Sequence, residues 1–209
     1  MTSRRFGAAG LTLGVAIGAA TVATPAPPAS RDPDWPCQQI KVPQLSLVAV
    51  WSGPALDAQQ NDWRQDQQVV DLVQATVQRR MPIEQAQAEI RAFAARAGEQ
   101  KQPKLLQLLA GLFSTLNDER TAVIAGLDRF GVRQEVLAAE LRNDNAKLRA
   151  MQADSSSAPN DVNQMTQRLT WEAQVFQDRR QALSYACDVP GKIEQRLFTL
   201  ARTIQEALQ

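Results

Sequence analysis

Residues 105–151 have the sequence LLQLLAGLFSTLNDERTAVIAGLDRFGVRQEVLAAELRNDNAKLRAM. Alternating steps of three and four residues through this stretch select one stripe of side chains: Leu106, Leu109, Phe113, Leu116, Arg120, Val123, Leu127, Phe130, Gln134, Leu137, Leu141, Asp144, Leu148 and Met151. This spacing places the stripe, apolar at all but three positions, on one side of an α-helix. The helix is on the order of 70 Å long at about 1.5 Å per residue. Because so long an apolar stripe must pack against other helices, the sequence predicts an all-α, elongated antiparallel helical bundle.

Weaker stripes of the same kind predict four more helices, which gives a bundle of about five. We expect them at residues 56–80, 83–97, 160–187 and 192–208. Pro82, Gly98, the loop at residues 154–160 and Pro190–Gly191 separate them. Asn160 or Asp161 is expected to cap the helix that begins there.

Three glycines lie inside the long helix, at positions 111, 126 and 131. Each costs about 1 kcal/mol of helix stability relative to alanine. A bend or brief break near Gly131 would explain this cost, and so would close packing of another segment against the bare backbone. The sequence leaves both explanations open.

The first 23 residues have the layout of a secretory signal peptide. Arg4 and Arg5 precede a small, apolar run at residues 6–20, and small residues follow at 21–23. The run is short for a membrane anchor, and the residues after the arginine pair do not complete a twin-arginine signal. We therefore expect ordinary export, a chain that begins near Thr24, and a periplasmic or secreted location without membrane insertion after cleavage.

After the signal peptide we expect a disordered Pro/Ala-rich leader at residues 24–34 and a single helical domain at 35–209. Residues 35–54 contain Pro36, Pro43 and Pro54, which favour an extended strap over a helix. The strap is either an apolar strip that docks a partner through Trp35 and Trp51 or a segment buried on its own bundle. We expect burial of both tryptophans, because Cys37 can pin the strap.

Cys37 and Cys187 are the two cysteines of the chain. In an oxidising compartment two cysteines usually form one disulfide, so we predict a Cys37–Cys187 bond. Lipid modification of Cys37 is disfavoured, because Asp34-Trp35-Pro36 is not the small aliphatic run that such a site requires.

Composition argues against several classes of function. The net charge of +1 becomes −1 when Arg4 and Arg5 are removed with the leader, which leaves no basic footprint for nucleic acid or an anionic membrane. The chain has no histidine, the commonest general base and metal ligand. Carboxylates that could serve a glycosidase have the spacing of ordinary solvated helix faces: Glu119, Glu135, Glu140 and Glu172. We therefore expect neither an enzyme nor a cofactor.

Polar residues inside the apolar stripes are the remaining candidates for a site. They are Arg120, Gln134 and Asp144 on the long helix, and Glu172 and Arg179 on the next. An antiparallel hairpin closed by the loop at 154–160 puts Gln134 level with Arg179, so we predict that Gln134 accepts a hydrogen bond from this guanidinium. Such a polar layer would fix helix register or bind a small ligand.

These observations favour a non-catalytic exported protein that binds another protein of the cell envelope, as a chaperone-like protein, an adaptor or an accessory subunit. Exposed helix faces also leave a homodimer open. The alternatives are a bundle that binds a small ligand in its polar layer and, less favoured, an envelope hydrolase.

Overall fold

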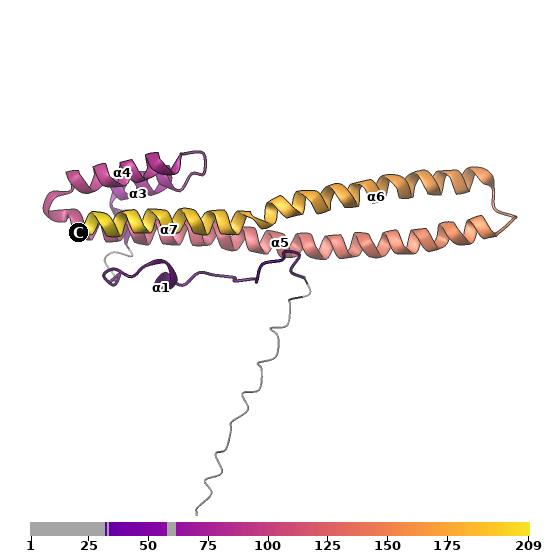
Figure 1. The fold of residues 1–209 in the computed structure, drawn as a ribbon, viewed down its shortest axis with the longest axis horizontal. Coiled ribbons are helices and arrows are strands. Elements are labelled where there is room, and N and C mark those ends of the chain that lie inside the picture. Colours follow the sequence, from indigo (N-terminus) through magenta and orange to yellow (C-terminus); the bar gives the residue numbers. More distant parts are fainter. Residues whose placement is uncertain (1–31, 33, 58–61) are drawn as a thin grey trace, which may run out of the picture. The chain divides into compact units, whose positions relative to one another are not determined.

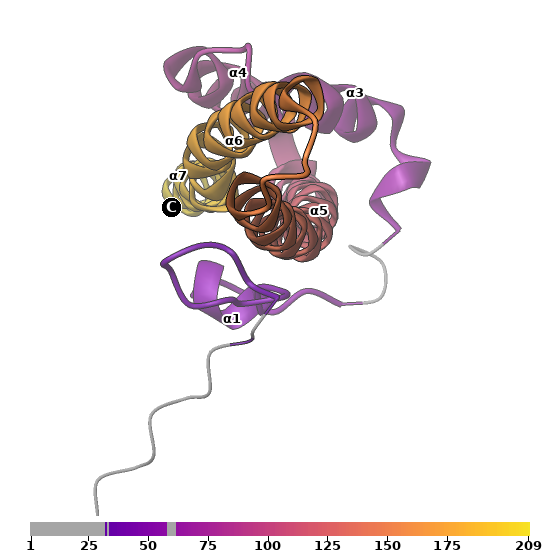
Figure 2. The same ribbon diagram turned by 90° about the vertical axis from the view of Figure 1, so that its right-hand side faces the viewer.

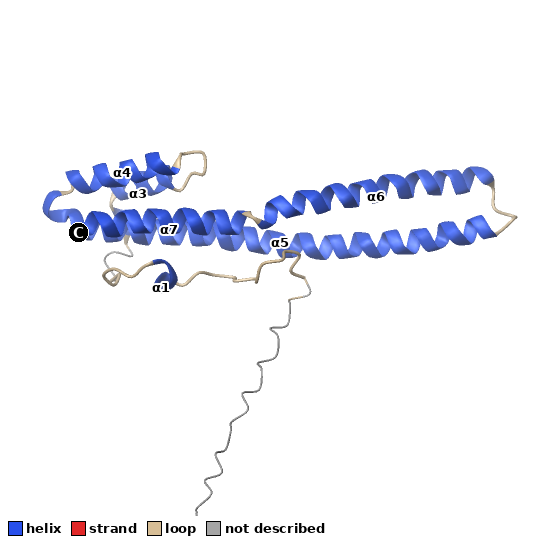
Figure 3. Cartoon of the chain, viewed as in Figure 1, coloured by secondary structure: helices blue, strands red, loops and turns tan. Residues whose placement is uncertain are grey.

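The structure is a computed structural model and describes residues 32, 34–57 and 62–209 (Figure 1). The predicted signal peptide, and nearly all of the predicted leader, lie outside the described residues. Within them the chain consists of helices and loops, with no strand (Figure 3). The predicted all-α helical bundle is confirmed.

Five helices of ten or more residues make up most of the described chain. They are α3 (Gln67–Thr76), α4 (Ile83–Arg96), α5 (Lys101–Ala153), α6 (Pro159–Cys187) and α7 (Val189–Leu208). Three single turns accompany them: α1 (Leu47–Val50) and the 3-10 turns η1 (Trp63–Gln65) and η2 (Gly98–Gln100).

Helix α5 is continuous over 53 residues, about 80 Å. Helices α6 and α7 follow one another along it in the opposite direction, and α3 with α4 covers a different side of this pair from the strap (Figures 1 and 2). Two of the three glycines within α5 are explained by close packing. A Cβ at Gly131 would overlap the Asp34 carbonyl oxygen, and one at Gly111 would lie 2.7 Å from Val73 Cγ2.

The hydrophobic core lies where α3, α4 and α7 surround the first half of α5. Its largest fully buried side chains come from these four helices: Val69, Val73, Ile90, Leu105, Leu108, Leu109, Leu112, Leu116, Ile193, Leu197, Leu200 and Ile204. Each such side chain contributes about 1.5–3 kcal/mol on burial. Beyond Leu127, α5 packs on α6, and Asp128 and Gly131 also contact residues 34–41. We call residues 128–153 of α5, together with α6, the arm; most of its apolar seam is only half-buried.

The helix predicted at residues 56–80 is wrong at both ends. Leu56 and Asp57 are not helical, residues 58–61 lie outside the described chain, and α3 spans only Gln67–Thr76. Asp66 explains the late start, because its carboxylate accepts hydrogen bonds from the backbone N–H groups of Gln68 at 3.0 Å and Val69 at 3.3 Å. It is the N-cap of α3 and not a polar interruption within a longer helix.

The boundary between α6 and its neighbours also differs from the prediction. Ala158, not Asn160 or Asp161, occupies the N-cap position of α6, and Pro159 follows in the first turn, where its missing N–H costs little. Pro190 likewise lies in the first turn of α7. Pro190 was expected to end the previous helix, but it belongs to the beginning of the last one. Helix α7 therefore starts at Val189 and not at residue 192.

The strap, residues 35–54, is irregular: it bends at residues 37–39, 43–44 and 53–54 and forms the single helical turn α1. That turn falls inside the run 45–51, which was expected to be extended. Val50 and Trp51 are buried, and Leu45 and Leu47 pack against the core. The strap therefore closes one side of the bundle with its inner side chains. Across the described chain, no helix combines the length and hydropathy needed to span a bilayer.

Candidate functional site

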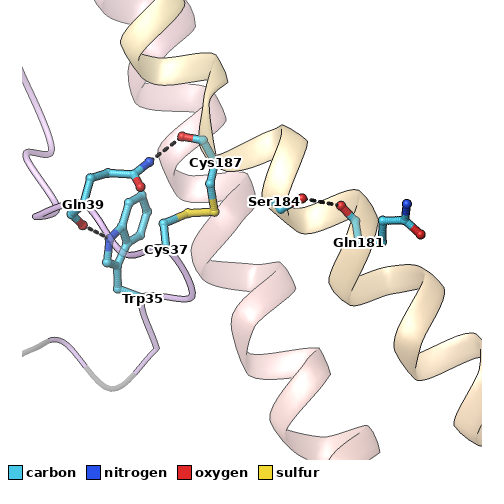
Figure 4. The surroundings of a disulfide bond; sticks show 6 residues. All are labelled: Trp35, Cys37, Gln39, Gln181, Ser184 and Cys187. Atoms are coloured by element: carbon cyan, nitrogen blue, oxygen red, sulfur yellow. Dashed lines mark hydrogen bonds between the residues drawn. A yellow bond between two sulfur atoms is a disulfide. The ribbon is translucent and has the colours of Figure 1, made fainter.

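The predicted disulfide joins the beginning of the strap to the end of α6 (Figure 4). Cys37 and Cys187 are bonded, with their Cα atoms 5.7 Å apart. The Gln39 side-chain amide donates a hydrogen bond to the Cys187 carbonyl oxygen, and the Trp35 indole N–H donates to the Gln39 carbonyl oxygen at 2.6 Å. The strap is thus held at the point where α6 gives way to α7.

A buried arginine of α5 holds the middle of the strap. Arg120 is 3% exposed, and its Nε donates to Glu194 Oε1 of α7 at 2.6 Å while its Nη1 donates to the Val42 carbonyl oxygen at 2.6 Å. One turn earlier in α5, the Asn117 side chain exchanges hydrogen bonds with the backbone of Leu45. Arg120 therefore joins α5, α7 and the strap, and its partners satisfy a charge that would be costly to bury alone.

The strap turns a charged side chain inward between two apolar side chains that face outward. Lys41 Nζ lies 2.6 Å from Asp32 Oδ2 and 2.9 Å from Asp128 Oδ2 of α5. Its hydrogen bonds to Asp32 and then Asp128 raise the pKa of Lys41. Both neighbours of Lys41 are exposed, Ile40 at 84% and Val42 at 44%, and both line a depression that Arg120 and Ile124 of α5 also border. A segment that served only to cover the bundle would bury its apolar side chains and expose its lysine.

Two depressions lie between the strap and α7. The larger, about 420 Å³, is bounded by Ile40 and Val42 on one side and by Pro190 and Glu194 on the other. The smaller, about 230 Å³, lies farther along, between the turn α1 and the middle of α7. Val48, 86% exposed, and Phe198, 45% exposed, both line it. We call Ile40, Val42, Val48 and Phe198, with these two depressions, the strap–α7 face.

Both tryptophans of the strap border the two depressions, Trp35 the larger and Trp51 the smaller. Trp51 is buried, as predicted, and its indole N–H donates to the Pro54 carbonyl oxygen at 2.7 Å. Trp35 is only half-buried, so the prediction of full burial is wrong for it, and it lines the larger depression. Trp51 is therefore a core residue that also borders the smaller depression, and Trp35 forms part of the wall of the larger one.

The predicted contact between Gln134 and Arg179 is wrong. Gln134 Nε2 donates to the Phe176 carbonyl oxygen at 3.5 Å, and within the described residues Gln134 Oε1 has no hydrogen-bond partner. Arg179 is exposed, because the rotation of α6 about its axis takes this side chain out of the seam and into solvent. No polar layer forms at this level of the hairpin.

The other polar residues of the stripes are dispersed along the molecule. Glu172 accepts from Arg168 Nε at 2.7 Å, one turn earlier in α6. Arg168 Nη2 also lies 3.5 Å from Asp144 of α5, to which Lys147 donates at 2.8 Å. These contacts fix the outer part of the arm, whereas Arg120 lies in the region of the strap. The structure does not gather the predicted candidates into one ligand site.

Neither helical periodicity nor composition indicates that Ile40, Val42, Val48 or Phe198 belongs to a site. The order Ile40-Lys41-Val42 shows an alternation of apolar and charged residues, but it does not indicate which side of the strap faces α5. Phe198 is adjacent to Leu197 and so falls outside the buried stripe of α7. Val48 carried no such signal, because the turn α1 changes the alternation there.

In the part of the chain that the structure describes, no group of three or more His, Cys, Asp or Glu side chains is placed to hold a metal ion. No family model, no curated protein and no solved structure matches this chain.

Proposed function

We propose that the chain is a non-catalytic protein that binds an extended, apolar segment of another protein on its strap–α7 face. The observation that carries the proposal is the inverted strap pattern, in which Lys41 turns inward while Ile40 and Val42 point to solvent. Exposed apolar side chains that gather beside depressions are typical of interaction surfaces.

The backbone of the strap also supports strand addition. Within the described residues, the N–H groups of Ile40, Lys41 and Val42 donate no hydrogen bond, and these residues belong to neither a helix nor a turn. An incoming strand could accept from the donors on one edge, which are either those of Ile40 and Val42 or that of Lys41, while its apolar side chains enter the two depressions. Because the disulfide and Arg120 already hold the strap in place, little conformational entropy is lost on binding.

The proposal places this activity outside the cytosol. The signal-peptide layout at residues 1–23 and the Cys37–Cys187 disulfide support a periplasmic or secreted location. We keep the partner class broad, as a protein of the cell envelope. A small ligand in a polar layer is no longer favoured, because Gln134 and Arg179, which motivated it, lie apart.

The experiment is site-specific photo-crosslinking in the cells that make the protein. A benzophenone amino acid is placed at Ile40, at Val48 and, as a control, at Val136, which is exposed on the arm. We expect one discrete product, identified by mass spectrometry, from positions 40 and 48 but not from 136. Equal products from all three positions, or none from 40 and 48, would contradict the proposal.

Affinity measured with the purified partner completes the test. Ile40→Asp and Val48→Asp each place a charge on the face and should weaken binding at least tenfold, whereas Val136→Asp should leave it unchanged. Suppression of aggregation of many unrelated unfolded proteins, equally by all three variants, would instead favour a general chaperone.

A further inference from the structure

A second apolar groove lies where α6 meets α7, away from the strap. It has a volume of about 330 Å³ and is lined almost wholly by apolar groups of α5 and α6, among them Val123, Gly126, Leu127, Phe130, Leu183 and Ala186. Val189, at the start of α7, closes one end. The lining residues of α5 have the spacing of one helix face, which is the face that packs on α6. The groove therefore continues the seam between α5 and α6.

The floor of this groove contains the one glycine of α5 that the packing of the described chain does not explain. Gly111 and Gly131 are each approached closely by side chains or backbone of the same chain. At Gly126 a Cβ would meet only Arg129 Nη2, at 3.9 Å, which is an ordinary contact. A glycine within a helix lowers helix stability. Its effect here is to leave bare backbone where a bound molecule can approach closely.

Among the described residues, the one charged side chain that lines the groove is the cationic Arg79. Arg129 lies outside this lining, but its Nη2 is 3.9 Å from the position that a Cβ at Gly126 would take. Arg79 does have an acidic neighbour, Glu119, but the Nε–Oε1 distance is 3.5 Å and the arginine side chain is 57% exposed. Such a pair is weak in solvent, so Arg79 remains able to bind another anion.

We propose that this groove binds one saturated acyl chain with a carboxylate headgroup, such as a free fatty acid of about twelve carbons. The volume is near the lower end of that of small-molecule sites, which suits one chain better than the two chains of a phospholipid. The apolar walls take the chain along the seam, over Gly126, and the carboxylate binds at Arg79 and Arg129. The inference is independent of the protein partner proposed above.

A second copy of the chain fits the groove less well. It would bring the same two arginines to an interface that already has two, and like charges brought together oppose association. The carboxylate of a fatty acid supplies the missing negative charge.

The test is isothermal titration calorimetry of the purified protein with dodecanoate, kept below its micelle concentration. Dodecyltrimethylammonium, with the same chain and the opposite charge, is the ligand control. We expect dodecanoate to bind with one-to-one stoichiometry and at least tenfold more tightly than the cation. Equal binding of the two, or no binding of dodecanoate, would overturn the proposal.

Variants then locate the site. Gly126→Leu fills the groove and should weaken dodecanoate binding at least tenfold. The matched control is Gly191→Leu, since within the described chain a Cβ at Gly191 also meets open space and this residue lies outside the groove. Should Gly126→Leu not fold by circular dichroism, Ala182→Phe fills the same groove from α6.

Arg79→Gln combined with Arg129→Gln should remove the preference for dodecanoate over the cation while keeping the fold. Dodecanoate binding that is equal in wild type, Gly126→Leu and Ala182→Phe would overturn the assignment of the site. A dimer that light scattering detects in wild type and that Gly126→Leu disrupts, without dodecanoate binding, would overturn the proposal in favour of self-association.

Discussion

Arg120 and Glu194 join the middle of α5 to the first turns of α7 through an Nε–Oε1 contact of 2.6 Å. The arginine side chain is almost fully buried, whereas the glutamate is about one-third exposed. The same guanidinium also holds the Val42 carbonyl oxygen. Removing the glutamate charge therefore leaves a buried cation without its counter-charge, whereas the loss of an exposed ion pair would matter little.

We expect Glu194→Gln to lower the free energy of unfolding by about 2–4 kcal/mol, because the charge of Arg120 stays buried and unpaired. Urea unfolding followed by circular dichroism measures the change. Glu206→Gln, on an exposed position of the same helix, is the control and should change stability by less than about 0.5 kcal/mol. A Glu194→Gln variant as stable as the control would contradict this role of Arg120.

Asp66 should contribute to stability as the N-cap of α3. Burial alone would raise the pKa of its carboxyl, but the hydrogen bonds from Lys104, Val69 and Gln68 outweigh this effect and lower the pKa below its ordinary value. Asp66→Ala should lower the free energy of unfolding by about 0.5–2 kcal/mol at pH 7. Asp62→Ala, four residues earlier, is the control.

The pH dependence of this contribution follows from the lowered pKa. A carboxyl whose pKa is lower in the folded state stabilises the fold above its unfolded pKa, and this stabilisation disappears as the pH falls through the folded value. The difference between wild type and Asp66→Ala should therefore be full at pH 7 and should shrink as the pH falls below about 4. A difference that persists unchanged at pH 2 would argue against the ionised cap.

Gln134 and Arg179 should act independently. Gln134→Leu removes a buried oxygen that has no partner among the described residues, so we expect stability to rise by about 1 kcal/mol or to stay unchanged. Arg179→Leu changes an exposed side chain. In a double-mutant cycle the two effects should add to within about 0.5 kcal/mol. A larger coupling energy would mean that the two side chains meet in solution.

Reduction of the Cys37–Cys187 bond should lower the free energy of unfolding by up to about 5 kcal/mol, because the bond spans 150 residues and restricts the unfolded chain. Denaturant titrations with and without dithiothreitol measure the effect. In the control, Cys37→Ser with Cys187→Ser, the reductant should have no effect. A wild-type midpoint that does not move on reduction would show that the bond adds no stability.

The parts of the fold that could be predicted are those with long, regular patterns. The stripe from Leu106 to Met151 was sufficient to identify α5. The register of the hairpin of α5 and α6 was also nearly correct, since Asp144 lies opposite Arg168. Helix rotation could not be predicted in the same way. Near Gln134 the apolar seam is too weak to fix which side of α6 faces α5, and so Arg179 lies outside.

The face proposed to bind a partner depended on contacts that join distant parts of the sequence. Lys41 faces inward because Asp128 of α5 lies opposite, and nothing within residues 35–54 indicates this neighbour. The cap at Asp66 was also missed, because an aspartate inside a plausible helical stripe gives the same pattern as an aspartate that begins a shorter helix. In both cases local periodicity was insufficient.

The strap also has a consequence for the order of folding. Its hydrogen bonds to α5 join residues 72 and 78 positions apart, and those to Cys187 and Gln205 join residues 148 and 153 positions apart. Helices α5 and α6, by contrast, pair through a single short loop. Contacts so distant in sequence form slowly, because loop closure costs entropy before they are made. The strap should therefore dock last. This is so even though it leaves the ribosome before any of the helices on which it packs. Until then its cysteine is exposed to thiols of neighbouring chains, so slow docking at high concentration favours cross-linked dimers over the correct monomer.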